Sequence, residues 1–326
     1  MTATKKARRD AFARVHEAIT ESLKKGVVPW RKPWTTKRRN VTLADILSGN
    51  WGPANWVSKK QYRGVNAFVT GSAGYDSRFW LSFKQADALG GYVQGKATSV
   101  VFWKISEYDD PKDLDEAGDP KRKKSFFLRF SNVWNTDECW LPEKVQAKID
   151  AANAGEIAEP VAEPVVEEEA EEEFVEIEAG EIVLRSYFGT DDAPKFGFNG
   201  SRAYYSHDDR VSVPRPEQFD APDYYYSTVY HEIAHSTGAK KRLDRLSDDG
   251  FGSHEYSKEE LVAEMTAAIL SDMTGMNHAT VENSAAYIQN WLSKLDDDPK
   301  MLVYAGGAAQ KAVDFVVEKI RAEATA

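Results

Sequence analysis

A short stretch in the second half of the chain decides its fold, Tyr230-His-Glu-Ile-Ala-His-Ser-Thr-Gly238. On a helix, residues four apart are separated by about 400° of rotation and about 6 Å of rise, so His231 and His235 share one face and can bind one metal ion. Glu232 lies beside them, where it can take a proton from a water bound to that metal. The two residues between Glu232 and His235 are apolar, as a buried helix requires. The stretch predicts a metal-binding helix with Glu232 as its general base.

A third protein ligand is expected on a second helix, predicted for residues 257–273. Glu260 and Glu264 are four residues apart and share one face of that helix, so one carboxylate can bind the metal while the other orients a histidine ligand. We assign Glu260 as the ligand and Glu264 as its support. Ser257 and Glu260 also fit a capping box, and in that alternative Glu264 is the ligand.

The metal and the remaining candidates follow from the same donor set. Two histidines and a carboxylate suit Zn²⁺ best and also accept Mn²⁺ or Co²⁺. His207 and His254 are further candidate ligands, and Tyr256 is a candidate donor to a developing oxyanion. The alternative without a metal is a helix whose two histidines are satisfied by hydrogen bonds alone.

Charge is distributed unevenly along the chain. The full 326 residues carry 42 Lys and Arg against 52 Asp and Glu, a net charge of -10. Residues 1–150 hold 27 basic and 17 acidic residues, residues 151–184 hold 12 glutamates and no basic residue, and residues 185–326 hold 15 basic and 23 acidic residues. Because phosphate backbones attract Lys and Arg, binding of a nucleic acid is expected in the first block alone.

The basic block also contains eight of the nine tryptophans. Rings that stack on bases, interleaved with cations that neutralise phosphates, are what a sequence-tolerant binder of single-stranded DNA requires. The first candidate cluster is Trp30, Arg31, Lys32, Trp34, Lys37, Arg38 and Arg39. The second is Lys59, Lys60, Tyr62, Arg63 and Asn66. Trp80, Trp103 and Trp134 lie in apolar strand patterns and are assigned to the core. In the alternative, this block docks a protein or RNA partner.

The predicted fold class is α+β with two domains. Residues 1–150 form an N-terminal α+β domain, residues 151–182 an acidic linker, and residues 183–326 a C-terminal domain that carries the metal motif. The glutamates of the linker repel one another and offer little to bury, which predicts disorder. The alternative for the linker is an intramolecular DNA mimic that rests on the basic block.

Periodicity and turn residues place the elements within each domain. In the N-terminal domain we expect helices at 7–25 and 84–89, strands at 79–82, 98–105 and 125–133, and an exposed loop at 108–124. In the C-terminal domain we expect strands at 203–205 and 210–214, and helices from 224 onward and at 257–273, 281–295 and 307–322.

Compartment signals favour the cytoplasm. Cys139 is the only cysteine, so no intramolecular disulfide can form, which suits a reducing compartment. The basic N-terminus lacks the apolar core of a signal peptide, and no stretch approaches the roughly 18 apolar residues of a membrane span. We therefore predict a soluble cytoplasmic protein with no membrane partner.

Short motifs mark both the first and the last block. In the first block they are Gly26-Val-Val-Pro-Trp-Arg-Lys-Pro-Trp34, Tyr62-Arg-Gly-Val-Asn-Ala67, Trp80-Leu-Ser-Phe-Lys-Gln-Ala-Asp-Ala-Leu-Gly-Gly91 and Val100-Val-Phe-Trp-Lys104. In the last block they are Tyr230-His-Glu-Ile-Ala-His-Ser-Thr-Gly238, Arg242-Leu-Asp-Arg245 and Glu259-Glu-Leu-Val-Ala-Glu264. In this order, the motifs resemble those of the ArdC-type antirestriction proteins.

The resemblance implies an N-terminal domain that binds single-stranded DNA non-specifically and a C-terminal zincin-like metallopeptidase domain. A protein of this kind protects incoming plasmid DNA, typically entering by conjugation, or phage DNA from host restriction enzymes. We therefore expect a zinc-dependent peptidase joined to a DNA-binding module, with a protein substrate that the sequence does not identify. In the alternative, the protein coats DNA, its metal site is structural or inactive, and it is not an enzyme.

Overall fold

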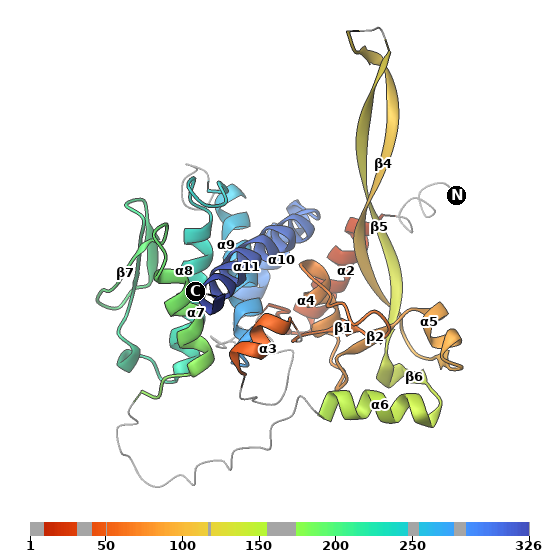
Figure 1. Ribbon diagram of the computed structural model, residues 1–326, viewed down its shortest axis with the longest axis horizontal. Helices are drawn as coiled ribbons and strands as arrows, with labels where there is room; N and C mark the ends of the chain where they lie inside the picture. Colours follow the sequence, from red (N-terminus) through yellow and green to blue (C-terminus); the bar gives the residue numbers. More distant parts are fainter. Residues whose placement is uncertain are drawn as a thin grey trace.

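The structure, a computed structural model, has a helical body from which one long β-hairpin projects (Figure 1). The residues that it describes are 10–30, 41–49, 51–116, 119–154, 174–246, 254–276 and 285–325. Most of the first predicted DNA-binding cluster lies outside these residues, namely Arg31, Lys32, Trp34, Lys37, Arg38 and Arg39, and so do residues 155–173 of the predicted linker. Among the described helices, none is long and apolar enough to cross a membrane.

Helix α2 (Ala11–Lys24) opens the N-terminal part, which we define as residues 10–154. Its first turn is capped by Asp10, whose Oδ1 accepts a hydrogen bond from the backbone N–H of Phe12 at 3.0 Å. The fully buried side of α2 consists of Val15, Ile19 and Leu23. This is the three- and four-residue spacing on which the helix was predicted.

Short elements and two long strands make up the rest of the N-terminal part. The short elements are α3 (Leu43–Ser48), β1 (Ala54–Asn55), α4 (Val65–Gly71), β2 (Phe79–Leu81), α5 (Phe83–Ala88) and β3 (Tyr92–Val93). Then come β4 (Thr98–Leu114), β5 (Pro120–Asn135), the 3-10 helix η1 (Thr136–Glu138), β6 (Cys139–Trp140) and α6 (Glu143–Ala154). The strands form a sheet in the order β1-β2-β5-β4 and a small pair, β3-β6.

Strands β4 and β5 form one long antiparallel hairpin, so the expectation of an exposed loop at residues 108–124 was wrong. The charged residues that suggested a loop face each other with opposite sign. Lys123 Nζ lies 2.7 Å from a carboxylate oxygen of Asp110, and Arg122 Nε lies 3.0 Å from one of Glu107. These cross-strand pairs allow the polar segment to continue the strand ladder.

The C-terminal part, residues 174–325, is mainly helical. Its elements are α7 (Glu178–Phe188), β7 (Lys195–Phe198), β8 (Tyr204–Ser206), β9 (Arg210–Val213), the 3-10 helix η2 (Pro216–Gln218), α8 (Pro222–Thr237), α9 (His254–Met273), α10 (Ala285–Asp297) and α11 (Met301–Thr325). The three strands form a sheet in the order β7-β9-β8, in which β8 is an edge strand. Helix α7 begins at Glu178, inside the segment expected to be linker, because its apolar residues pack into the core.

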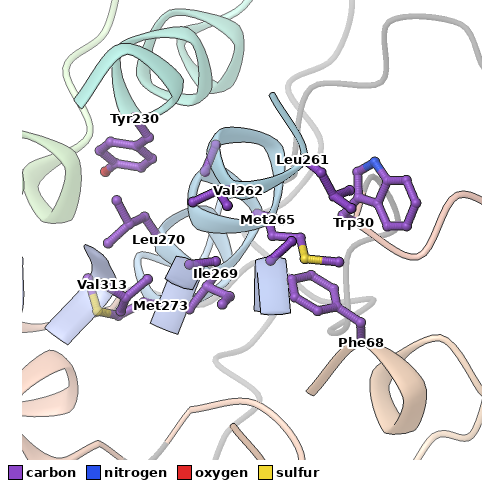
Figure 2. Packing of buried hydrophobic residues seen from close by; sticks show 14 of the residues in the cluster. Trp30, Phe68, Tyr230, Leu261, Val262, Met265, Ile269, Leu270, Met273 and Val313 are labelled. Carbon is purple, nitrogen blue, oxygen red and sulfur yellow. The ribbon is translucent and has the colours of Figure 1, made fainter. Parts of the chain in front are cut away.

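The N-terminal and C-terminal parts share one hydrophobic core. Buried side chains of α2 and α4 belong to the same cluster as those of α8, α9 and α11. Figure 2 shows Trp30 and Phe68 of the N-terminal part in this cluster together with Leu261 of α9. Where α4 meets α11, a Cβ added to Gly306 would lie 2.6 Å from the backbone nitrogen of Val65, so this approach requires glycine.

Trp30 is a core residue, and the expectation that it stacks on DNA bases was wrong. Its side chain is 0% exposed, and its indole Nε1 donates a hydrogen bond to the Tyr287 hydroxyl at 3.2 Å. The ring also makes an edge-to-face contact with Trp291, with centroids 5.5 Å apart. Trp80 is buried as expected, whereas Trp103, also assigned to the core, is 47% exposed on the hairpin.

Candidate metal centre

Helix α8 places His231 and His235 on one face, with their Nε2 atoms 3.1 Å apart. The helix has Pro222 in its first turn, where the missing N–H of proline costs no helical hydrogen bond. Between the two histidines, Ile233 and Ala234 are fully buried against the core. The two imidazoles therefore lie on a helix that is fixed by packing on its opposite side.

Helix α9 packs against α8 and brings Glu260 to the two histidines. One carboxylate oxygen of Glu260 lies 3.6 Å from His231 Nε2, and the other lies 3.5 Å from His235 Nε2. Among the described residues, these three are the group whose potential metal ligands converge, with all ligand atoms within 4.8 Å of one another. A tetrahedral zinc ion with ligands at about 2.1 Å separates its ligand atoms by about 3.4 Å. The observed spacings fit such an ion with three protein ligands and a fourth position left for water or substrate.

We expected Glu264 to support a histidine ligand. The carboxylate that supports His235 belongs to Glu259 instead. Glu259 Oε1 lies 3.2 Å from His235 Nδ1, on the side of the ring opposite the converging Nε2 atoms. Glu264 instead accepts a hydrogen bond from the Tyr287 hydroxyl at 3.1 Å and is not in the converging group. Residues four apart share one face of α9, but it is the adjacent residues Glu259 and Glu260 that reach the two nitrogens of one imidazole.

Arg245 holds Glu259 in place. Its Nε and Nη2 donate to the two Glu259 carboxylate oxygens at 2.7 Å and 2.8 Å, and Nη2 also donates to the Ala234 carbonyl at 2.8 Å. Burial raises the pKa of Glu259, but Arg245 and His235 outweigh it and hold this pKa below its usual value. Burial lowers the pKa of His235, but the hydrogen bond that its Nδ1 donates to Glu259, together with the neighbouring carboxylate charges, outweighs burial and raises this pKa. Glu259 thus stays ionised and fixes the orientation of the ring.

Arg242 is a second arginine beside the centre, and the sequence alone did not indicate its role. Its side chain is 1% exposed and forms an ion pair with Asp209, in the turn between β8 and β9. It also donates to the Ser236 carbonyl at 2.6 Å and to the Asp192 carbonyl at 2.8 Å. Arg242 therefore ties the C-terminal end of α8 to the neighbouring sheet. The Arg242-Leu-Asp-Arg245 motif beside a histidine helix was the signal that could have identified both arginines.

Glu232, the predicted general base, lies beside the converging ligands in a nearly closed environment. Its side chain is 6% exposed, and burial raises its pKa to about 7. The nearby backbone N–H of Tyr205 in β8 opposes part of this rise in the pKa of Glu232. Tyr256 lies within hydrogen-bonding reach of Glu260, and burial together with the Glu260 charge raises its pKa to about 12, so this phenol keeps its proton at neutral pH. His207 is exposed and outside the converging group.

The second predicted DNA-binding cluster is only partly exposed. Lys60 is exposed, and so is Lys59, whose ammonium group lies over the ring of Trp56. Tyr62 is half-buried and packs against the cluster that contains Trp80. These three residues keep their predicted role as candidates for DNA contact.

Arg63 and Asn66 of that cluster have partners within the protein. Arg63 forms an ion pair with Asp314 of α11, across the contact between the two parts. The Asn66 amide donates to the carbonyl of Val101 at 2.7 Å and accepts from its N–H at 2.7 Å. Asn66 thus joins α4 to strand β4, and we assign it to the fold rather than to the DNA surface.

Two family models match the chain, one over each part. A model for the N-terminal domain of the anti-restriction factor ArdC matches residues 9–134. A model for a zincin-like metallopeptidase matches residues 188–309, which contain α8 and α9. The expected two-domain α+β fold is thereby confirmed.

Similar proteins and solved structures agree with these matches. The chain is 32% identical over 317 residues to the DNA primase TraC of Escherichia coli, which covers 93% of this chain but 19% of that relative, so the chain spans about a fifth of its length. The metal-free crystal structure of the antirestriction protein ArdC from plasmid R388 has a TM-score of 0.68 and 27% identity, over 96% of this chain and 98% of that chain. Its Mn(II)-bound crystal structure has a TM-score of 0.65 and 26% identity, over 95% and 98%. The chain therefore has an ArdC-type N-terminal domain followed by a zincin-like metallopeptidase domain, and it shares its fold with the antirestriction protein ArdC of plasmid R388.

Proposed function

We propose that this protein hydrolyses peptide bonds with a divalent metal and binds single-stranded DNA, and that it thereby protects incoming plasmid or phage DNA from host restriction. The observation that carries the proposal is the convergence of His231, His235 and Glu260 beside the buried Glu232. This donor set suits Zn²⁺ best. The Mn(II)-bound structure of the R388 protein, which has the same fold, supports the binding of a divalent metal ion by this chain. A metal bound here would supply Lewis-acid polarisation of a carbonyl and of water.

The side chains around the ligands have the properties that peptide hydrolysis needs. Glu232 takes a proton from the attacking water and later gives it to the leaving amine, and its raised pKa suits a group that works in both directions near neutral pH. Tyr256 remains protonated and can donate to the oxyanion that forms on the attacked carbonyl. Arg245 and Glu259 keep His235 oriented during these steps.

The position of strand β8 favours an extended peptide as the substrate. It pairs with β9 on one side only, because it is the edge strand of its sheet. The backbone N–H of Tyr205, in the centre of β8, lies near enough to Glu232 to lower its pKa, so β8 runs beside the metal centre. An extended peptide that adds to this edge would run past the general base and the converging ligands.

The DNA-binding half of the proposal rests on the N-terminal part. The ArdC-type N-terminal model matches residues 9–134, and the basic charge of the chain is concentrated in residues 1–150. Glutamates alone make up the charge of residues 151–184, which keeps DNA away from the C-terminal part. Lys59, Lys60 and Tyr62 remain candidate contacts, together with the first predicted cluster from residue 31 to residue 39.

The decisive experiment is the substitution Glu232→Gln, with metal content measured on the purified protein. Glutamine keeps the size of the side chain but cannot accept the proton, so we expect Zn²⁺ to be retained and peptide hydrolysis to be lost. The biological readout is the survival of an unmodified plasmid that enters a restricting host expressing the protein. The matched control is Glu217→Gln, which changes an exposed carboxylate of the same part of the chain.

Loss of plasmid protection in Glu232→Gln, with normal metal content, supports the peptidase. Full protection by this variant would show that the metal site is structural and that coating of DNA is the whole function. Protection that fails equally in the Glu217→Gln control would point to a folding effect in both variants, and thermal melting of both proteins identifies it.

A further inference from the structure

The β4–β5 hairpin presents two different faces to its surroundings. In an antiparallel pair, residues directly opposite each other lie on the same face, and successive residues alternate between faces. One face therefore carries the pairs Val101 and Phe130, Trp103 and Leu128, and Ile105 and Phe126. The other carries Phe102 and Arg129, Lys104 and Phe127, and Tyr108 and Lys123. We call them the apolar face and the mixed face.

The apolar face is turned toward the helical body at its base. Val101 is buried in the main core, and Phe130 packs against it. Further out, Trp103 contacts Phe12 of α2 and Tyr304 of α11, with ring centroids 6.2 Å and 6.4 Å apart. The mixed face consequently points away from the body over the same length of hairpin.

The mixed face alternates rings and cations across the two strands. Phe102 and Phe127 are 49% and 48% exposed, and each lies opposite a basic residue, Arg129 and Lys104 respectively. The two rings occupy diagonal positions of neighbouring pairs, about 7–8 Å apart at the backbone. Exposed rings next to cations are what stacked bases and their phosphates require.

Charge pairing separates this region from the tip of the hairpin. Toward the tip, Lys121 and Lys123 contact Asp113, and Lys124 contacts Glu107, so those cations are neutralised within the hairpin. No ion pair with a described residue is found for Lys104 or Arg129, and both are exposed. Apart from Lys112 near the tip, the available positive charge of the described hairpin residues thus lies beside Phe102 and Phe127.

The base of the mixed face leads to the candidate contacts of the N-terminal part. Val100, which precedes Phe102 on this face, is buried in one cluster with Trp80. Tyr62 packs against that cluster and follows directly on Lys59 and Lys60 in the chain. A single DNA strand that lies on the mixed face can therefore continue toward Lys59 and Lys60.

We propose that the mixed face of the hairpin is a stacking platform for single-stranded DNA, in which Phe102 and Phe127 stack on bases while Lys104 and Arg129 bind the flanking phosphates. This inference rests on the proposed DNA binding and names the surface that performs it. A ring has no preference for one base, so the platform is tolerant of sequence. Duplex DNA, with its bases already stacked, is not a match for exposed rings.

The test uses the full-length protein and a fluorescent 20-nucleotide poly-dT in an anisotropy titration at several salt concentrations. The platform variant is Phe102→Ala/Phe127→Ala. Its matched control is Ile105→Ala/Phe126→Ala, which removes two equally exposed side chains, 54% and 59%, from the apolar face of the same hairpin segment. A second variant, Lys104→Gln/Arg129→Gln, removes the two cations and keeps the rings.

We expect the platform variant to bind poly-dT at least about 30-fold more weakly and the control to bind within about threefold of the wild type. The cation variant should reduce the slope of log K against log salt by about 1.4, since each phosphate contact contributes about 0.7. Circular dichroism and metal content of each variant establish that the fold is retained.

The outcomes separate the platform from the proposed function beneath it. If the wild type binds no poly-dT even at low salt, the proposed DNA binding is wrong and the platform falls with it. If the wild type binds and the platform variant binds equally well, DNA binding stands but its surface lies elsewhere, and the platform is overturned. Loss of binding in the control alone would assign the DNA to the apolar face and overturn the inference.

Discussion

The metal centre and the β4–β5 hairpin use charge in opposite ways. At the centre, Arg245 and Glu259 are 16% and 15% exposed, and both partners make further bonds to the histidine helix. On the hairpin, the Lys123 side chain is 40% exposed in its pair with Asp110. When a buried ion pair loses one member, the other charge stays buried without compensation. When an exposed ion pair loses one member, water solvates the remaining charge. Substitutions should therefore be severe in one region and mild in the other.

The largest effect should come from a tryptophan of the shared core. Trp30→Ala removes a fully buried indole that contacts Trp291 and bonds to Tyr287, so we expect the free energy of unfolding to fall by about 3–5 kcal/mol. Trp103→Ala on the hairpin, where the ring is half-exposed, is the matched comparison and should cost much less. Urea denaturation of both variants measures the difference. Equal losses would mean that the hairpin base is as much a part of the core as Trp30.

A smaller effect on stability, with a specific effect on metal binding, is expected for Arg245→Ala. The substitution leaves the Glu259 carboxylate buried beside His235 without its main partner, so we expect a loss of about 3 kcal/mol. The His235 ring also loses its fixed support, which should weaken zinc binding about 10- to 100-fold in a competition titration with a chelator. Arg245→Lys keeps the positive charge but not the two parallel donors of the guanidinium. Its stability and zinc affinity should lie between those of the wild type and those of Arg245→Ala. Unchanged zinc affinity in Arg245→Ala would exclude Glu259 from the support of the ligand.

The smallest effect is expected when the outer hairpin is removed. Residues 108–123 can be replaced by Asn-Gly, because Glu107 and Lys124 lie opposite each other and a two-residue turn can join them. The deleted cross-strand pairs are on the surface, so the urea midpoint and the zinc affinity should stay those of the wild type. A clear drop in either would show that the outer hairpin contributes to the body of the protein.

The sequence predicted best what depends on spacing within one helix. His231, Glu232 and His235 lie within five residues, and helix geometry alone places them together. Glu260 was assigned from its position on a second helix, and the structure brings its carboxylate to the two histidines. The helices themselves followed from apolar periodicity, as the buried side of α2 shows.

What the sequence did not reveal depends on partners far away in the chain. The burial of Trp30 depends on contacts with Tyr287 and Trp291, which lie more than 250 residues later in the chain. Glu259 reaches His235 only because of how α9 lies on α8, which spacing along one helix does not specify. In the outer hairpin most cations of β5 meet carboxylates of β4 across the ladder, and neither strand alone contains that information.

The burial of α2 also affects the order in which the protein can fold. Helix α2 contacts α10 and α11, and its Val15, Ile19 and Leu23 belong to the core that those helices complete. A ribosome makes α2, α4 and the hairpin long before it makes α11, so α2 can pack on these N-terminal neighbours first and completes its core contacts only once α11 has been made. Domains usually fold in sequence as they emerge. Here the N-terminal part is expected to acquire its final packing only after translation has passed α11.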